Sequence, residues 1–174
     1  MGHWVSVAVV PAFVFTAAGC SGSSATGAIT VIPVADRQSP VEMSATTVDG
    51  EKLDIAVLRG KPLVMNVWGS WCGVCRKEAP ALQQAYDELR GTTNFVGIAF
   101  DDTRAGAQTH EKKYRVTYPS LLDEGDLLLQ LNGAVTSRAI PVTLVLDARG
   151  RIAARYVGAV SKETLKDVVK DVSG

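Results

Sequence analysis

The order of strand and helix patterns in this chain predicts an α/β sandwich with a mixed central sheet and helices on both faces. The first observation is an apolar strand pattern over 63–68, followed by a helical pattern to about residue 90 and a second strand over 94–100. The second observation is a pair of strand patterns over 142–146 and 152–157, with a helical pattern after them. Together they give the order βαβ and then αββα.

Two hairpins are expected within this frame. The first joins strands over 44–48 and 52–55, at the start of the domain. Asp49 and Gly50 lie between these strands and are a strong signal for a type I′ turn. The second hairpin joins the two late strands through a turn over 147–150.

The stretch between the two halves is expected to hold a polar helix over 104–114, a short strand over 120–122 and a brief apolar helix over 127–131. His110 lies on the polar helix, so the sequence favours a surface position for it. Ser161 is the expected cap of the last helix, which has a packed face at helical spacing formed by Leu165, Val168, Val169 and Val172.

The first twenty residues read as a targeting segment outside the fold. Their apolar stretch has the length of a signal sequence and is short for a membrane span. The small residues before Cys20 resemble the lipobox of bacterial lipoproteins, in which that cysteine is diacylated and begins the mature chain. A plain secretory signal and an uncleaved anchor are the alternatives.

Residues 21–39 are small and polar and are expected to form a flexible tether, which leaves residues 40–174 as one domain of ordinary size. Lys plus Arg and Asp plus Glu number 18 each, so the chain has no net field that would attract an anionic partner. No basic patch with interleaved aromatic residues is present either, and the sequence gives no support for binding nucleic acid.

Two cysteines with two residues between them lie at the junction of the first strand and the helix after it. Cys72 falls at the helix start, where unpaired N–H groups and the helix dipole favour a thiolate. Its pKa is therefore expected to fall from about 8.5 to about 7 or lower. Cys75 lies one helical turn later, so it is expected to be deeper and to act as the resolving thiol.

These residues carry a family resemblance. The segments RGKPLVMNVWGSWCGVCRKEAP and AIPVTLVLDARGRI, with the terminal helix, resemble the extracytoplasmic thioredoxin-like proteins of the TlpA and ResA type, which are tethered to bacterial membranes. The match covers residues 41–173. It implies a thioredoxin-like three-layer sandwich in which the segment 101–131 is a central insertion.

The resemblance also implies roles for particular residues. Cys72 and Cys75 are the redox pair, and Pro141 is a cis-proline that faces them, although an X-Pro bond judged from sequence alone would be trans. The backbone of Ile140 is then free to pair with an extended substrate peptide. Glu78 is expected to tune the protonation of the pair; without the resemblance it would be read as a solvated carboxylate.

Two positions depart from the pattern. Asn66 stands where thioredoxins have a buried aspartate, and an amide cannot carry a proton, so deprotonation of Cys75 is left to Glu78 or water. Val74 stands where the family more often has proline, so the reduction potential cannot be transferred from relatives. Of the two nearby tryptophans, Trp71 is expected to be an exposed lip for substrate, and Trp68 is expected to be core.

Other interpretations of the cysteine pair are weaker. Half of a zinc site would need a second pair of ligands, and the remaining candidates are Cys20, His3 and His110, so no metal or other cofactor is expected. A purely structural disulfide would close a very small loop and add little stability. A peroxidatic thiol is possible in this fold, but a second cysteine after the tryptophan favours disulfide exchange.

The sequence thus predicts a monomeric, lipid-anchored thiol–disulfide oxidoreductase on the outer side of the bacterial cell membrane. Its expected substrates are extended segments of exported proteins, such as the haem-binding cysteine pairs of apocytochromes c, and a membrane redox protein would supply electrons. Two alternatives stay open: an oxidase that forms disulfides in exported proteins, and a binding module of the same fold whose disulfide is inert.

Overall fold

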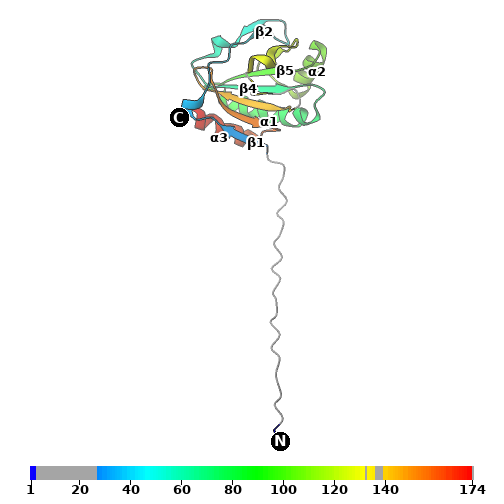
Figure 1. Ribbon diagram of the computed structural model, residues 1–174. Coiled ribbons are helices and arrows are strands. Elements are labelled where there is room, and N and C mark those ends of the chain that lie inside the picture. Colours follow the sequence, from blue (N-terminus) through cyan, green and yellow to red (C-terminus); the bar gives the residue numbers. More distant parts are fainter. Residues whose placement is uncertain (3–26, 132, 136–138, 174) are drawn as a thin grey trace.

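The computed structural model describes residues 1–2, 27–131, 133–135 and 139–173, and its centre is a six-stranded mixed sheet (Figure 1). The strands lie in the order β1-β8-β7-β4-β5-β6, and a separate two-stranded hairpin pairs β2 with β3. The strands are β1 Ala28–Val31, β2 Ser44–Thr46, β3 Lys52–Asp54, β4 Leu63–Trp68, β5 Asn94–Ala99, β6 Ser120–Leu122, β7 Val142–Leu146 and β8 Ile152–Val157. The helices are α1 Gly73–Leu89, α2 Arg104–Tyr114 and α3 Lys162–Ser173, with 3-10 helices η1 Val34–Asp36, η2 Ile55–Leu58 and η3 Leu127–Leu131.

The predicted mixed α/β sandwich is confirmed. Strands β4, β5 and β6 are parallel, because α1 and α2 return the chain to the same edge, while β7, β8 and β1 are antiparallel to their neighbours. The strand β4 lies inside the sheet, and all six of its residues are buried. The end of β4 is therefore buried, with β7 on one side of the strand and β5 on the other.

The two faces of the sheet are covered differently. Val64 of β4 packs in one apolar cluster with residues of α1 and α3, whereas Met65 packs in another with residues of the hairpin region and of η2 and η3. Figure 1 shows β2 on one side of the sheet and α1 and α3 on the other. Within the described residues, the helices on the second face are thus short 3-10 turns and not α-helices.

The first hairpin forms where it was expected, but its turn is not type I′. That type needs positive φ at both central residues, and Gly50 has a φ of 98° while Asp49 is not among the residues with positive φ. The N–H of Gly50 donates to the carbonyl of Thr47 (2.9 Å), and the N–H of Thr47 donates to the carbonyl of Glu51 (2.7 Å). The turn is a type I turn followed by a left-handed glycine, which is the other common way to close a hairpin.

The tether predicted up to Ser39 is wrong from Ala28 onward. Residues 28–31 form β1, which pairs antiparallel with β8 from Ala28↔Val157 to Val31↔Ala154. The segment AITV is rich in β-branched residues, but it is short, and its partner strand lies near the other end of the sequence. Residues 21–26, and the targeting segment apart from Met1 and Gly2, lie outside the described part of the chain. Within the described part, no helix combines the length and hydropathy needed to cross a membrane.

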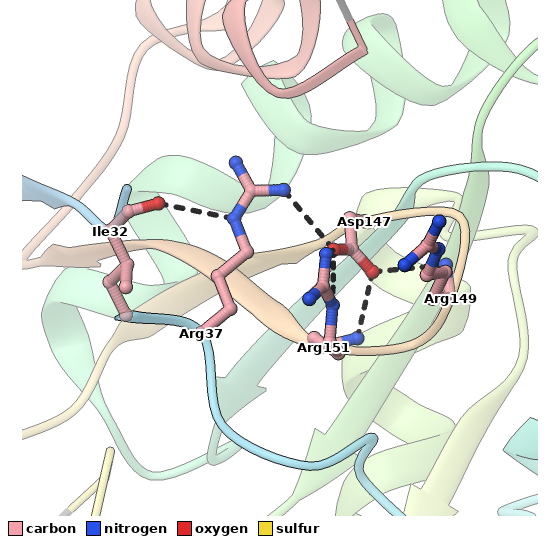
Figure 2. A network of polar contacts seen from close by, with 5 residues as sticks. All are labelled: Ile32, Arg37, Asp147, Arg149 and Arg151. Carbon is pink, nitrogen blue, oxygen red and sulfur yellow. Dashed lines mark hydrogen bonds and ion pairs between the residues drawn. The ribbon is translucent and has the colours of Figure 1, made fainter. Parts of the chain in front are cut away.

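An ionic network fixes the segment after β1 to the turn between β7 and β8 (Figure 2). Arg37 donates from Nε to the carbonyl of Ile32 (3.1 Å) and from Nη1 to Oδ2 of Asp147 (3.1 Å). Arg151 donates from Nε to the same Oδ2 (2.8 Å), and Oδ1 of Asp147 accepts the backbone N–H groups of Arg149 and Arg151. The side chains of Arg37 and Asp147 are only 9% and 8% exposed, so the network is shielded from water.

The network sets the ionisation of Asp147. Burial alone would raise the pKa of this carboxyl, but hydrogen bonds from Arg151, Arg37 and Arg149 outweigh burial, and the pKa is lowered. Because the folded pKa is depressed, the stabilisation is present above the ordinary pKa of 3.8 and is lost as the pH falls through the folded value.

We expect Asp147→Asn to lower the free energy of unfolding by about 3 kcal/mol at pH 7, since it leaves two largely buried guanidinium groups without their anion. Chemical denaturation measures this change. The loss should shrink in acid, where the wild-type carboxyl is also neutral. Asp36→Asn, which changes an exposed carboxylate in the same segment, is the matched control and should be near neutral. An equal loss in the two variants would contradict the role of the network.

Candidate active site

The buried strand β4 leads directly to the cysteine pair at the start of α1. Cys72 is the N-cap residue of α1, and its Sγ accepts the backbone N–H of Cys75 (3.1 Å). The two cysteines form a disulfide with Cα atoms 5.3 Å apart. Cys72 is 6% exposed and Cys75 is 1% exposed, so the first sulfur is the more accessible one, as the sequence predicted. A thiolate at Cys72 would be stabilised by the N–H groups of the first helical turn.

Trp71 forms an exposed lip beside the disulfide, as predicted, with 52% of its surface accessible. Its indole Nε1 donates to the backbone carbonyl of Asp101 (2.9 Å). The ring lies over Gly69, where a Cβ atom would come within 2.8 Å of it, so a larger residue at this position would displace the indole. Val74, which replaces the usual proline, is 47% exposed and adds apolar surface at the same place.

Asp102 holds the loop between β4 and α1, and sequence reasoning missed it. Its carboxylate accepts the backbone N–H of Ser70 (2.6 Å) and the hydroxyl of Ser70 (2.9 Å). Asp102 follows β5, the parallel neighbour of β4, so the two loops leave the same edge of the sheet. A pair of acidic residues, Asp101 and Asp102, just beyond the neighbouring parallel strand was the available signal.

Glu78 is buried beneath the pair, with 3% of its surface exposed. Its Oε1 accepts the side-chain amide of Asn66 (3.0 Å), and its Oε2 accepts the backbone N–H of Val160 (3.1 Å). The amide of Asn66 also donates to the hydroxyl of Thr143 (3.1 Å). The interpretation of Glu78 as a solvated carboxylate, which the residues alone favoured, is therefore wrong.

Burial raises the pKa of Glu78 from 4.5 to about 7, and the hydrogen bonds from Val160 and Asn66 only partly oppose that rise. A carboxyl that titrates near neutral pH can both accept and return a proton. Asn66 cannot do so, but it fixes the position of the group that can.

His110 is not a surface residue, contrary to the prediction. It is 5% exposed and stacks on Trp68, with ring centroids 4.3 Å apart. Burial is the main reason that its pKa falls from 6.5 to about 4, so the imidazole is neutral near pH 7. Trp68 is core, as expected, at 4% exposure.

A small cavity of about 10 Å³ lies between the Trp68–His110 stack and Cys75 of the redox pair. Its lining includes Cys75, Asn66, His110 and Tyr118. A cavity of this size has room for about one water molecule, and the polar groups in its wall are of the kind that hold one. The resolving cysteine thus borders an internal space that is also lined by Asn66, the hydrogen-bond partner of Glu78.

The loop before β7 completes the site. The Ile140–Pro141 peptide bond is cis, as the resemblance implied. Ile140 packs against the apolar cluster that contains Cys72, Cys75 and Trp68. The structure therefore brings the two cysteines, Trp71, Ile140 and Glu78 into one region, while Cys20 lies outside the described residues.

A central strand that leads to a helix opening with Cys-x-x-Cys, next to a cis-proline loop, defines the thioredoxin-like class of α/β proteins. The comparison with family models identifies the branch: residues 37–155 match the AhpC/TSA family, and the chain belongs to it.

Similar proteins are thiol–disulfide oxidoreductases by name. The thiol-disulfide oxidoreductase ResA of Bacillus cereus is 24% identical over 129 residues, which is 74% of this chain and 73% of the relative. The solved structure of a DsbF homologue from Corynebacterium diphtheriae has a TM-score of 0.75 at 27% identity, covering 90% of this chain and 98% of that one. A secreted Mycobacterium tuberculosis disulfide oxidoreductase, homologous to E. coli DsbE, has a TM-score of 0.67 at 30% identity, with 75% and 96% covered.

Glu78 and His110 should make stability depend on pH in opposite directions. The folded protein binds the Glu78 proton more tightly than the unfolded chain, so ionisation costs about 3 kcal/mol of stability as the pH rises from 4.5 to about 7. For His110 the folded pKa is the lower one, so stability rises with pH between about 4 and 6.5.

We therefore expect Glu78→Gln to gain stability over this pH range relative to wild type, after a constant offset for the altered bond to Val160. His110→Phe, which keeps a ring against Trp68, should show the reverse trend. Denaturant unfolding of the oxidised protein at several pH values measures both. Parallel curves for wild type and Glu78→Gln would contradict a raised pKa of Glu78.

Proposed function

We propose that this protein is an exported thiol–disulfide oxidoreductase whose Cys72–Cys75 pair reduces disulfides in other exported proteins. The observation that carries the proposal is the pair itself: a disulfide at the first turn of α1, with Cys72 the more exposed sulfur and Trp71 beside it. The similarity to thiol-disulfide oxidoreductase ResA and the membership of a thioredoxin-like family support it.

The reaction proceeds through two thiol–disulfide exchange steps. In the reduced enzyme the thiolate of Cys72 attacks one sulfur of the substrate disulfide; a mixed disulfide forms, and the other substrate sulfur leaves as a thiolate that takes a proton. Cys75 then loses its proton and attacks Cys72, which releases the second substrate thiol. Two electrons pass to the substrate, and the enzyme keeps the Cys72–Cys75 disulfide.

Glu78 is the proposed acceptor for the proton of Cys75. Cys75 is almost fully buried, so bulk water does not reach it directly. The adjacent cavity is lined by both Cys75 and Asn66, and the amide of Asn66 donates to the carboxylate of Glu78, so one side chain separates the cavity beside the thiol from the proposed acceptor. A pKa near 7 lets Glu78 release the proton again in the reverse reaction.

The proposed location is the outer face of a bacterial cell membrane, through acylation of Cys20. The lipobox-like sequence before Cys20 supports it, and so does the secreted M. tuberculosis homologue of similar structure. The proposed substrates are extended cysteine-bearing segments, such as those of apocytochromes c, and a membrane redox protein would reduce the enzyme again.

Single cysteine variants separate the two sulfur roles. Cys75→Ser should react once with a peptide disulfide and accumulate the mixed disulfide on Cys72, because the resolving thiol is missing. Cys72→Ser should form no adduct, since Cys75 is almost fully buried. Mass spectrometry of the acid-quenched reaction detects the adduct. An adduct on Cys75 in the second variant would reverse the assignment.

The reduction potential decides between the proposed reductase and the oxidase alternative, in which the pair forms disulfides in newly exported proteins. Equilibration of the pair in defined thiol–disulfide buffers should give a value near or below about −230 mV for a reductase, or one approaching about −120 mV for an oxidase. We expect the lower value. The absence of any reversible couple would instead leave a redox-inert binding module.

A further inference from the structure

The N-terminal end of β1 lies at the catalytic end of the sheet. Ala28 pairs with Val157, and Val157 pairs on its other side with Val142, the residue that follows the cis-proline. The next residue, Gly158, donates its N–H to the carbonyl of Pro141 (2.9 Å). The chain therefore enters the domain beside the loop that faces the redox pair.

Gly27, just before β1, is held against the same end of β8. A Cβ atom at Gly27 would lie 2.3 Å from the carbonyl oxygen of Val157 and 2.4 Å from the ring of Tyr156, so the backbone is in close contact there. The other end of the segment is fixed by Arg37 at the turn between β7 and β8. The segment is thus held at both ends, by β1 and Gly27 at the catalytic end and by the side chain of Arg37 at the far end.

Little chain is left to separate this end from Cys20. Seven residues lead from Cys20 to Gly27, and they span at most about 25 Å when fully extended. Across the sheet, β1 and β4 are three strand spacings apart, or about 14 Å, and Cys72 follows β4. The turn at the opposite end of β8 is a further strand length away, about 20 Å.

We propose that the anchor at Cys20 holds the domain with its catalytic end toward the membrane, so that Cys72 reacts preferentially with disulfides and thiols at the membrane surface. This inference rests on the proposed function and adds its geometry. The exposed surface at that end fits a lipid interface, because Trp71 and Val74 are half-exposed and apolar, and tryptophan is enriched at membrane–water boundaries.

The test compares two disulfide probes on the acylated full chain, reduced and reconstituted in phosphatidylcholine vesicles. One probe is a phospholipid with a pyridyldithio headgroup, and the other is soluble dipyridyl disulfide. Attack by Cys72 forms a mixed disulfide and releases pyridine-2-thione, which is followed by absorbance. Cys75 then closes the Cys72–Cys75 disulfide and releases the lipid thiol, or a second pyridine-2-thione from the soluble probe.

The main variant carries a Gly/Ser insertion between Ala25 and Thr26. An insertion of about twenty residues lengthens the connection almost fourfold, which lowers the effective concentration of the domain at its own membrane roughly eightfold. We expect the rate with the lipid probe to fall by about that factor, and the rate with the soluble probe to stay unchanged.

A second comparison tests the orientation. Arg149→Cys, in a Cys72→Ser/Cys75→Ser background, places a thiol on the exposed turn at the opposite end of the sheet. Its rate with the lipid probe, divided by its rate with the soluble probe, should be well below the same ratio for Cys72. Equal ratios at the two positions, or an insertion without effect on the lipid-probe rate, would overturn the orientation.

Failure of the proposed function gives a different pattern. If mass spectrometry shows a mature chain that begins at unmodified Ser21 or later, the proposed lipid anchor is contradicted, and so is the orientation that depends on it. If the wild-type chain does not react with the soluble probe, the proposed oxidoreductase activity itself is contradicted. Orientation alone fails only in a chain that is acylated and reacts normally with the soluble probe.

Discussion

The carboxyl group of Glu78 joins three parts of the site through two hydrogen bonds. It lies on α1, accepts from Asn66 on β4, and accepts from the backbone of Val160 in the loop between β8 and α3. The same asparagine bonds to Thr143 on β7, so the central strands and the catalytic helix are fixed to one another through a single buried acid. Burial disfavours the charged carboxylate and so raises the pKa of Glu78 to about 7. The same burial therefore lets the group gain and lose a proton near neutral pH.

The surroundings of Cys75 are close to electrically neutral when the protein is folded near pH 7. His110 is uncharged because burial lowers its pKa, and burial of Tyr118 raises the pKa of its phenol well above the ordinary value. Glu78, in contrast, has its pKa raised to about 7 by burial, so it is partly ionised near pH 7. A carboxyl that titrates near neutral pH is therefore hydrogen-bonded to Asn66, which lines the cavity that Cys75 borders, and this arrangement supports the proposed proton transfer.

Local signals were sufficient for most elements of the fold, while long-range contacts decided the residues that were missed. The strand 63–68, the cysteine pair at a helix start and the Ser161 cap are each encoded within a few residues. β1 is short, and its strand character comes from pairing with β8. His110 lies on a mostly polar helix, and only its stack on Trp68 explains its burial. The role of Glu78 came from family resemblance, and its direct bond to Asn66 is visible only in three dimensions.

Reaction direction and access to substrate depend on different parts of this molecule. The reduction potential is a property of the pair and its surroundings, where Val74 replaces a rigid proline and Glu78 holds a proton near neutral pH. In the proposed orientation, access depends on where the chain enters the domain, and the packing of Gly27 and the pairing of β1 with β8 fix that point. Loss of the Arg37–Asp147 contact would leave β1 paired with β8, so the entry point near Gly27 would stay at the catalytic end. The pairing of β1 with β8 therefore carries the proposed orientation, whereas the side chains around Cys72 and Cys75 set the reduction potential, so substitutions can change the two properties separately.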